Sequence, residues 1–200
     1  MMPTQYFGKR AIDLVGGLLL SVAALPVLLM CGLAVKVSSP GPVIFAQDRV
    51  GLFGRVFVIY KFRTMMPGTN PVIPEPAAIT KVGKLLRRLS LDELPQLWNV
   101  LRGDMSLVGP RPTLMYQVER YTPRQLRRLS VRPGLTGLAQ VMGRNTLAWS
   151  ERIEYDLQYV DDQSLLLDLK VLLRTFAAVI EGSGVGKHAG DDPLSAVDQR

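Results

Sequence analysis

Two adjacent acidic residues in a basic stretch are the side chains of this sequence best suited to chemistry. Asp92 and Glu93 lie in the segment 90–96, SLDELPQ. Ser90 followed three residues later by Glu93 matches a capping box, and acids in the first turn of a helix interact favourably with its dipole. A carboxylate that stays ionised can also attack phosphorus and carry a covalent phosphoryl group. The four-residue pattern alone favours helix capping, so a catalytic role depends on the neighbouring residues.

Several arginines surround this acidic pair along the chain. Arg87 and Arg88 precede the acids, and Arg111 follows them between Pro110 and Pro112, which restrict its backbone. Guanidinium groups bind phosphate oxygens in bidentate fashion, and their charge favours the ionised form of a nearby carboxylate. The pattern therefore indicates a site where phosphate groups and a divalent ion can meet.

The residue types also suggest a role for each acid. Asp92 has the short side chain expected of a nucleophile at the positive end of a helix, whereas Glu93 is the acid placed to cap the helix. Carboxylates are hard oxygen ligands, so we expect Mg²⁺ at Asp92 and Glu93, where it would bridge to the oxygens of a diphosphate.

The positive charge of the sequence is concentrated in its middle. The net charge is +7; residues 36–136 contain 16 Lys and Arg against 6 acids, whereas residues 145–200 contain 5 against 10. Such a basic region attracts nucleic acid, anionic lipid or phosphorylated substrates. Because Cys31 and His188 are the only cysteine and histidine, an intrachain disulfide is excluded and a zinc site of Cys and His is not expected.

An uncharged apolar segment near the N-terminus is long enough to cross a bilayer. Leu14–Val35 contains 22 residues without a charge, which meets the requirement of roughly 20 residues for a spanning helix. Lys9 and Arg10 precede the segment and Lys36 follows it. The positive-inside rule therefore gives no asymmetry between the two ends, and both look cytoplasmic.

Pro26 lies just past the middle of this segment and predicts an interruption. Proline breaks or kinks a helix, and Leu25 before it is pushed away from helical geometry. A helix that enters the bilayer, breaks at Leu25-Pro26 and returns to the same face fits the flanking charges, with Ser21 as a candidate partner for a freed carbonyl. A straight spanning helix that accommodates the proline fits the spacing equally well. A signal peptide fits less well, because residues 22–24 only loosely resemble a cleavage site.

The rest of the sequence alternates short predicted elements with turns. Two strand-like stretches, Val43–Gln47 and Arg55–Met65, flank a turn at residues 51–54 and predict a β-hairpin. Loops are expected at Pro67–Pro76 and Pro133–Gly137. Helices are expected at Ile79–Leu89, at Ser90–Leu101 with Gly103 as its stop, at Leu114–Leu129 with an interruption near Pro123, and at Ser164–Ile180.

These elements predict an α+β fold that is mainly helical, in one membrane-embedded catalytic domain of residues 1–200. Residues 1–36 are expected to form the membrane segment and residues 37–200 the cytoplasmic catalytic part, with a flexible tail from about residue 182. We expect Ser164–Ile180 to be an amphipathic helix at the membrane interface, beside the active site. A core helix is the alternative, because Leu-rich helices are usually buried.

Four long motifs occur in order along the chain: KFRTM at residues 61–65, LSLDELPQLWNVL at 89–101, GDMSLVGPRP at 103–112 and RPGLTG at 132–137. Together they resemble the bacterial sugar transferase family, the monotopic phosphoglycosyl transferases. The resemblance covers nearly the whole chain, and the motifs are specific to that family.

The resemblance implies a two-step, ping-pong transfer of a sugar phosphate. Asp92 would attack the sugar-bearing phosphorus of a UDP-sugar, release UMP and carry the phosphosugar until polyprenyl phosphate, undecaprenyl phosphate in most bacteria, accepts it. Glu93 matches the second acid, which supports the metal or the acceptor step, and Arg87 and Arg111 match phosphate-binding arginines. Further substrate-binding residues are expected within the same motifs: Lys61, Arg63, Pro110 and Pro112.

The resemblance also implies a location. The family uses a re-entrant helix broken near a proline, where Pro26 falls, and Leu25 stands where some relatives carry a serine. We expect the minimal catalytic form, without an additional N-terminal membrane bundle, in the bacterial inner membrane with its catalytic part facing the cytoplasm. It would act in the first membrane step of glycoconjugate synthesis, such as that of exopolysaccharide or lipopolysaccharide. The oligomeric state is open, a homodimer included.

A basic, membrane-anchored protein that binds polyanions is the alternative function. Such a protein has no need for Asp92 and Glu93 within its basic stretch, and the sequence lacks the interleaved aromatic residues of single-strand binders. We therefore expect a UDP-sugar, polyprenyl phosphate and membrane lipid as partners, and no nucleic acid.

Overall fold

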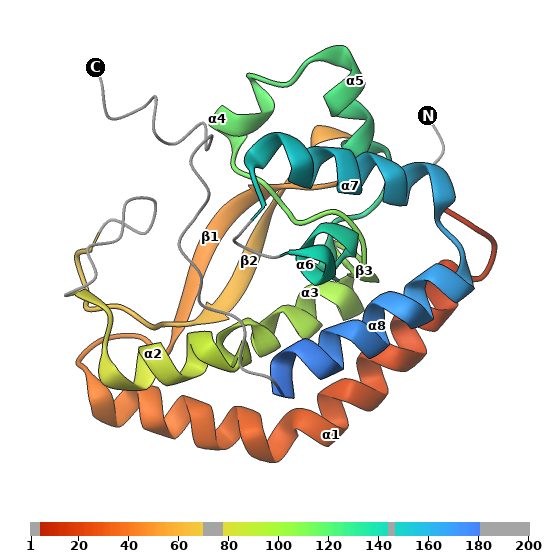
Figure 1. Cartoon of the computed structure of the whole chain (residues 1–200). Coiled ribbons are helices and arrows are strands. Elements are labelled where there is room, and N and C mark those ends of the chain that lie inside the picture. The colour runs from red at the N-terminus through yellow and green to blue at the C-terminus, as the bar shows by residue number, and fades with distance from the viewer. Residues whose placement is uncertain (1–4, 70–77, 144–146, 181–200) are drawn as a thin grey trace.

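A computed structural model of the protein describes residues 5–69, 78–143 and 147–180. This part of the chain is mainly helical with two small two-stranded sheets, which confirms a mainly helical α+β fold. Figure 1 shows a long helix, α1, along one side of the molecule, with a hairpin and the other helices on top of it. The expected flexible tail from about residue 182 and most of the loop Pro67–Pro76 lie outside the described residues.

The apolar N-terminal segment forms one continuous helix, α1 (Lys9–Ser38), with Pro26 inside it. The expected interruption of the helix at Leu25-Pro26 is therefore wrong, and Figure 1 shows a bend near the middle of α1 instead. A helix can keep most of its hydrogen bonds at a proline by bending. Ser21 does not compensate for the proline, because its hydroxyl donates to the carbonyl of Gly17 at 2.6 Å. Such back-bonding itself bends helices.

The two halves of α1 pack on different parts of the protein. In the first half, Gly16 allows close packing, because a Cβ at this position would lie 2.8 Å from Leu107 Cδ1. In the second half, Val35 is buried together with Leu86 of helix α2 (Lys81–Arg88). A bent helix satisfies both packing surfaces at once, which gives the bend a structural reason beyond the proline.

Most of the apolar surface of α1 is not covered by protein. Most leucine, valine and methionine side chains from Leu14 to Val37 along this helix are 41–79% exposed. Within the described part of the chain, α1 is the only helix long and apolar enough to cross a membrane by length and composition. An exposed apolar surface of this extent favours contact with lipid.

The predicted hairpin is present as strands β1 (Ile44–Val50) and β2 (Val56–Phe62), which pair antiparallel with Gln47 opposite Ile59. Its turn contains a short 3₁₀ helix, η1 (Leu52–Gly54). Side chains alternate between the two faces of a strand. Lys61 therefore shares a face of β2 with the buried Ile59, toward the centre of the molecule.

The acidic segment begins with a 3₁₀ turn rather than the single regular helix expected for Ser90–Leu101. Ser90 has a left-handed backbone with φ 57°, and it is followed by η3 (Leu91–Gln96) and α3 (Leu97–Arg102). The side chain of Ser90 makes no capping hydrogen bond, so the capping box is wrong. Gly103, with φ 94°, ends α3 as predicted.

A second small sheet and several helices complete the fold. Strand β3 (Ser106–Val108) pairs in parallel with β4 (Gly134–Thr136), so the expected loop Pro133–Gly137 contains a strand. The interrupted helical stretch predicted for Leu114–Leu129 corresponds to α4 (Met115–Val118), α5 (Pro123–Leu126) and η4 (Arg127–Ser130). The predicted helices include no counterpart of α6 (Leu138–Met142) and α7 (Trp149–Asp162). The last helix is α8 (Leu165–Ile180).

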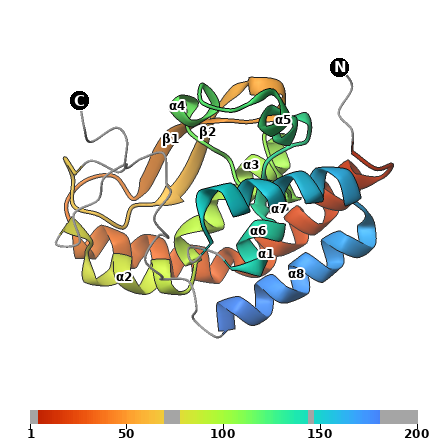
Figure 2. The ribbon, with the colours of Figure 1, turned by 45° about the horizontal axis from the view of Figure 1, so that its top comes forward.

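Helix α8 contacts the core on one side and exposes apolar side chains on the other. Val171 is buried in the core, whereas Leu166, Leu173 and Phe176 are 63–71% exposed. Figures 1 and 2 show α8 running beside the first half of α1. The exposed leucines do not fit the alternative of a core helix, since such a helix would bury them.

A buried network of charged side chains joins α1 to α8 and β3. Lys9, only 2% exposed, forms ion pairs with Asp13 at 3.1 Å and with Asp168 at 2.7 Å. Asp13 also accepts a hydrogen bond from the Ser106 hydroxyl, and Asp168 accepts one from the Tyr159 hydroxyl. Buried ions need such partners, because desolvation costs several kcal/mol per ion. Lys9 is therefore a structural residue rather than a surface charge that orients the membrane segment.

We expect Lys9→Met to lower the free energy of unfolding by about 3–5 kcal/mol, because the carboxylates of Asp13 and Asp168 lose their cation. Lys36→Met is the matched control, since Lys36 lies exposed in the last turn of the same helix. Thermal unfolding of both variants in detergent measures the difference. Equal midpoints for the two variants would contradict the structural role of Lys9.

Candidate active site

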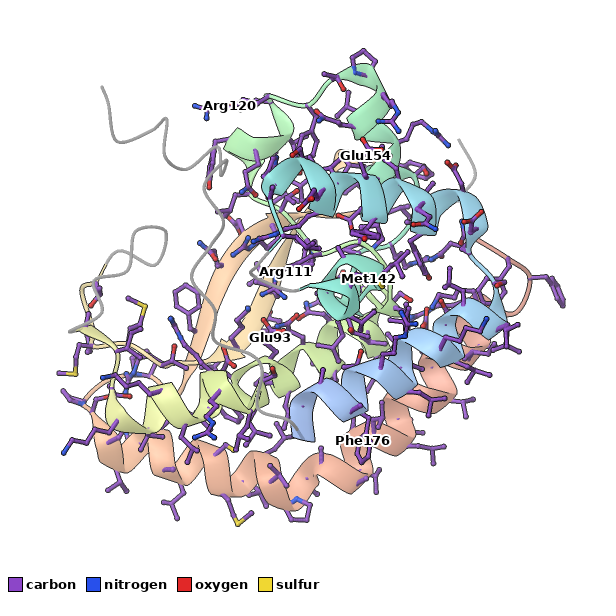
Figure 3. All side chains as sticks on the ribbon, in the orientation of Figure 1. Glu93, Arg111, Arg120, Met142, Glu154 and Phe176 are labelled. Carbon is purple, nitrogen blue, oxygen red and sulfur yellow. The ribbon has the colours of Figure 1, made fainter. Side chains whose placement is uncertain are left out.

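Glu93 lies at the centre of a cluster of charged residues from three segments. Its Oε1 atom is 2.7 Å from Lys61 Nζ on β2 and 2.7 Å from Arg111 Nη2 in the loop after β3. Arg111 Nη1 also lies 3.5 Å from Glu93 Oε2. Figure 3 shows Glu93 and Arg111 close together in front of the hairpin. Lys61 and Arg111 lie 32 and 18 positions from Glu93 in the sequence, so the two ion pairs join distant segments.

This environment determines the ionisation of Glu93. Although burial acts to raise its pKa, the charges of Arg111 and Lys61 hold the pKa of Glu93 far below its ordinary value. Glu93 is thus a permanent anion that fixes two cations, and the expectation that Glu93 caps the helix is wrong. A capping role was inferred from a local spacing, whereas the two ion pairs involve distant segments.

Asp92, the neighbouring acid, is in the opposite situation. Among the described residues, its carboxylate has neither an ion-pair partner nor a hydrogen-bond donor. Burial and the charge of Glu93 raise the pKa of Asp92, while Lys61, Arg87 and Arg111 oppose that shift. In a 3₁₀ helix with three residues per turn, adjacent side chains diverge by about 120°. The 3₁₀ turn therefore directs Glu93 to its two cations and leaves Asp92 available.

Arg87 lies in the last turn of α2 and close enough to Asp92 to affect its pKa. Its Nε donates to the hydroxyl of Thr64 at 2.8 Å, which leaves its terminal nitrogens for other acceptors. Arg88, one position on, is exposed. Successive helical residues point about 100° apart, so only Arg87 shares a face with the acidic pair.

Arg63 is positioned differently from the other predicted substrate-binding residues. It is buried, and its Nη2 donates to the carbonyl of Ser39 at 2.8 Å and to the Ser39 hydroxyl at 2.9 Å. These bonds connect the end of β2 to the residue that follows α1. The structure therefore brings Arg63 to the end of the membrane helix, and not to the carboxylate of Glu93.

The backbone around Arg111 is fixed by hydrogen bonds from several segments. Pro110 and Pro112 on either side of it are buried, while the Arg111 side chain is 50% exposed and can reach a ligand. The two prolines thus constrain the loop more than they offer contacts to a substrate. Four consecutive carbonyl groups accept hydrogen bonds: Pro110 from Gly134 N, Arg111 from Arg128 Nη2, Pro112 from Arg49 Nη1 and Thr113 from Val50 N.

Two residues of the site were not identified from the sequence. Burial and the nearby charge of Arg111 lower the pKa of Arg49 on β1 to about 10, which places a further cation at the site. The buried Asn99 of α3 donates to the carbonyl of Val58 at 2.7 Å and accepts from the backbone of Tyr60 at 3.3 Å. Asn99 thereby aligns β2, and with it Lys61, against the acidic segment. The only signal for Arg49 in the sequence was its position two residues after Gln47, which places both side chains on one face of an extended strand.

The site places an available carboxylate among several cations, next to a helix with an exposed apolar surface. Such an arrangement suits the handling of phosphate groups at a membrane. The comparison with protein families agrees with this interpretation. Residues 4–182 match the bacterial sugar transferase family, and the chain belongs to that family. It is therefore a transferase, and the resemblance of the four sequence motifs is confirmed.

Similar proteins come from distant bacteria. The chain is 44% identical over 180 residues to the uncharacterized sugar transferase EpsL of Bacillus subtilis (strain 168), which covers 88% of this chain and 89% of that protein. It is 44% identical over 185 residues to the UDP-glucose:undecaprenyl-phosphate glucose-1-phosphate transferase of Caulobacter vibrioides, covering 86% of this chain and 69% of that protein. It is 38% identical over 193 residues to an N-acetylgalactosaminephosphotransferase of Aeromonas hydrophila that is named for UDP-N-acetylgalactosamine and undecaprenyl phosphate, covering 91% of this chain and 46% of that protein.

The opposite environments of the two acids predict opposite effects on stability. Because the fold raises the pKa of Asp92, its ionised form destabilises the fold at neutral pH, and Asp92→Asn should raise the midpoint of thermal unfolding. Because the fold lowers the pKa of Glu93, its ionised form is stabilising, and Glu93→Gln should cost about 1–3 kcal/mol.

Thermal unfolding of both variants in detergent without divalent ions, as a function of pH, tests this pair of predictions. The gain from Asp92→Asn should diminish as the pH falls through the raised pKa of Asp92 and vanish below the ordinary pKa of an aspartate, while the loss from Glu93→Gln should persist to lower pH. Destabilisation by Asp92→Asn at neutral pH would contradict the assignment of Asp92 as the acid without a partner.

Proposed function

We propose that the protein transfers a sugar 1-phosphate from a UDP-sugar to polyprenyl phosphate, with undecaprenyl phosphate as the bacterial acceptor, and releases UMP. The reaction would proceed through a covalent phosphosugar on Asp92. The observation that carries this proposal is the carboxylate of Asp92, which forms no hydrogen bond or ion pair with the described residues and lies within the field of Lys61, Arg87 and Arg111. Such a carboxylate is free to attack, and the cations favour its ionised form and attract phosphate.

The names of the relatives support the two substrates. The Caulobacter protein is named for UDP-glucose and the Aeromonas protein for UDP-N-acetylgalactosamine, and both are named for undecaprenyl phosphate. The lipid acceptor is thus common to them while the sugar differs. We propose the same acceptor for this chain, in the first membrane step of the synthesis of a polysaccharide or other glycoconjugate.

In the first proposed step, an oxygen of the Asp92 carboxylate bonds to the sugar-bearing phosphorus of the UDP-sugar. The bond from that phosphorus to the bridging oxygen breaks, and this oxygen leaves with its electron pair on UMP. No proton has to be removed from the nucleophile, because a carboxylate attacks as an anion. Arg111, half exposed, and Arg87 would bind the phosphate oxygens on which charge develops.

In the second proposed step, a phosphate oxygen of polyprenyl phosphate bonds to the same phosphorus. The bond between phosphorus and Asp92 breaks, which restores the carboxylate and gives a polyprenyl diphosphate sugar. Glu93 would take part indirectly, since it fixes Lys61 and Arg111 at the site through both reactions. Reaction at one carboxylate in two successive steps corresponds to ping-pong kinetics.

The donor set of the site is suited to Mg²⁺. Two adjacent carboxylates offer hard oxygen ligands, and Mg²⁺ typically binds one or two carboxylates together with substrate phosphates. Asp92 has an available carboxylate, and in the described part of the chain Glu93 Oε2 makes only a long contact of 3.5 Å, to Arg111. These two residues would hold the ion, which supplies positive charge to the diphosphate when bound.

We also propose that α1 re-enters the bilayer from the cytoplasmic face of the bacterial inner membrane. Its bend, and the packing of both halves on the same protein body, support this topology (Figure 1). The exposed leucines of α8, beside the first half of α1, would then lie at the membrane interface, where an amphipathic helix is stable (Figure 2).

The covalent intermediate can be tested directly by intact-protein mass measurement. After incubation with a panel of UDP-sugars and Mg²⁺ but no polyprenyl phosphate, the wild-type protein should gain the mass of one phosphosugar and release UMP. Addition of polyprenyl phosphate should remove the added mass. Asp92→Asn should show neither the mass gain nor the release of UMP, because the amide has the same shape but is a poor nucleophile.

Asp162→Asn is the matched control, since Asp162 is an exposed aspartate at the end of α7 and does not belong to the charged cluster. It should retain adduct formation. An adduct of unchanged size in Asp92→Asn would place the nucleophile elsewhere, and UMP release without any adduct would contradict the ping-pong mechanism.

The topology predicts that both ends of α1 are accessible from the cytoplasm. Single cysteines at positions 4 and 38, in a chain with Cys31→Ser, should be labelled by a membrane-impermeant thiol reagent only after the inner membrane is opened. Labelling of position 4 in intact spheroplasts would show that α1 spans the bilayer. Pro26→Leu should shift part of the population toward that spanning form, because it restores the hydrogen bond that proline removes.

A further inference from the structure

The side chain of Arg128 connects the backbone of Arg111 to the interior of the protein. Arg128 Nη2 donates to the carbonyl oxygen of Arg111 at 3.0 Å. Arg128 is only 4% exposed, so it is not placed to bind a substrate itself. Its one link to the site is therefore through the residue that the proposed function assigns to phosphate binding.

Arg128 is itself fixed by two further partners. It forms a buried ion pair with Asp156 of α7, and its Nη1 donates to the hydroxyl of Tyr121, over whose ring the guanidinium lies at 5.4 Å. A planar guanidinium can serve three partners in fixed directions, which a lysine ammonium on a flexible stem cannot do. Arg128 thereby links the position of the Arg111 carbonyl to the position of α7.

We propose that Arg128, fixed by Asp156, is a positioning residue that sets the place of the Arg111 guanidinium at the diphosphate-binding site. The proposal rests on the proposed function, because it takes Arg111 as a ligand of the diphosphate of UDP-sugars. Within the described residues, the ion pair with Glu93 is what holds that half-exposed guanidinium beyond its own loop. A shift of the loop would therefore change where Arg111 meets a phosphate.

A purely structural role for Arg128 is the competing explanation, because two other arginines of the same segment also form ion pairs with α7. Arg124 pairs with Glu154, labelled in Figure 3, and Arg127 pairs with Asp161. Both pairs are exposed and join the segment of α5 and η4 to α7, as Arg128 does, but neither has a hydrogen bond to Arg111. They provide a control for the loss of a helix contact without loss of positioning.

The two explanations differ in how Arg128 and Arg111 combine. The dissociation constant of UDP, measured by fluorescence titration of the full chain in detergent, gives a double-mutant cycle with Arg128→Lys and Arg111→Ala. Arg128→Lys keeps the charge opposite Asp156 but loses the fork. It should weaken UDP binding by about fivefold or more in the wild type and by less than about twofold in Arg111→Ala, since residues that act as one unit are not additive. Arg127→Lys should leave the affinity unchanged in both.

Equal weakening in both backgrounds would overturn the proposal, because a structural effect acts whether or not Arg111 is present. Should Arg128→Lys fail to fold, Asp156→Asn replaces it, with the same pattern required at smaller size. UMP release by the wild type is measured separately. Its absence would reject the transfer reaction, while the cycle on UDP affinity would still decide whether Arg128 positions Arg111.

Discussion

The structure depends on a single shared anion at the site. Glu93 Oε1 lies 2.7 Å from both Lys61 and Arg111, so one carboxylate connects the hairpin, the acidic segment and the loop after β3. Without Glu93 the two cations would repel each other across a partly buried space. With it, a single negative charge faces two positive charges, and the remaining positive potential acts on Asp92 and on any phosphate that enters.

Polar contacts at both ends of the membrane helix connect it to this site. Near its start, Arg10 donates to the carbonyls of Val100 and Leu101 at 2.7 and 2.9 Å, at the end of the helix that follows the acidic segment. Just beyond its last turn, Ser39 accepts from Arg63, two residues after Lys61 along the chain. The apolar helix thus carries its exposed surface to the membrane while its ends bind the two segments that supply the charged cluster. Under the proposed function, the lipid acceptor in the membrane and the nucleotide donor in the cytoplasm would meet at this site.

Elements with a strong local pattern could be predicted from the sequence, and contacts between distant segments could not. The hairpin follows from alternation in residues 55–65, and the end of α3 follows from Gly103. The roles of Asp92 and Glu93 as a pair with nearby cations were visible, but the capping role of Glu93 was wrong because its partners lie far along the chain. Proline spacing predicted a disturbance of α1 and could not distinguish a break from a bend, since that depends on what each half of the helix packs against.

The different roles of the adjacent acids Asp92 and Glu93 follow from the conformation of the backbone that carries them. In a regular α-helix, Asp92 and Glu93 would differ by about 100° in direction, and both could face the same cations. The left-handed Ser90 and the 3₁₀ turn after it change the direction of entry and widen that divergence to about 120°. Glu93 then pairs with Lys61 and Arg111, while Asp92 has no partner among the described residues and remains within the field of both cations. The left-handed conformation of Ser90 costs free energy in itself. It thereby separates Glu93, which is fixed by two cations, from Asp92, which is available.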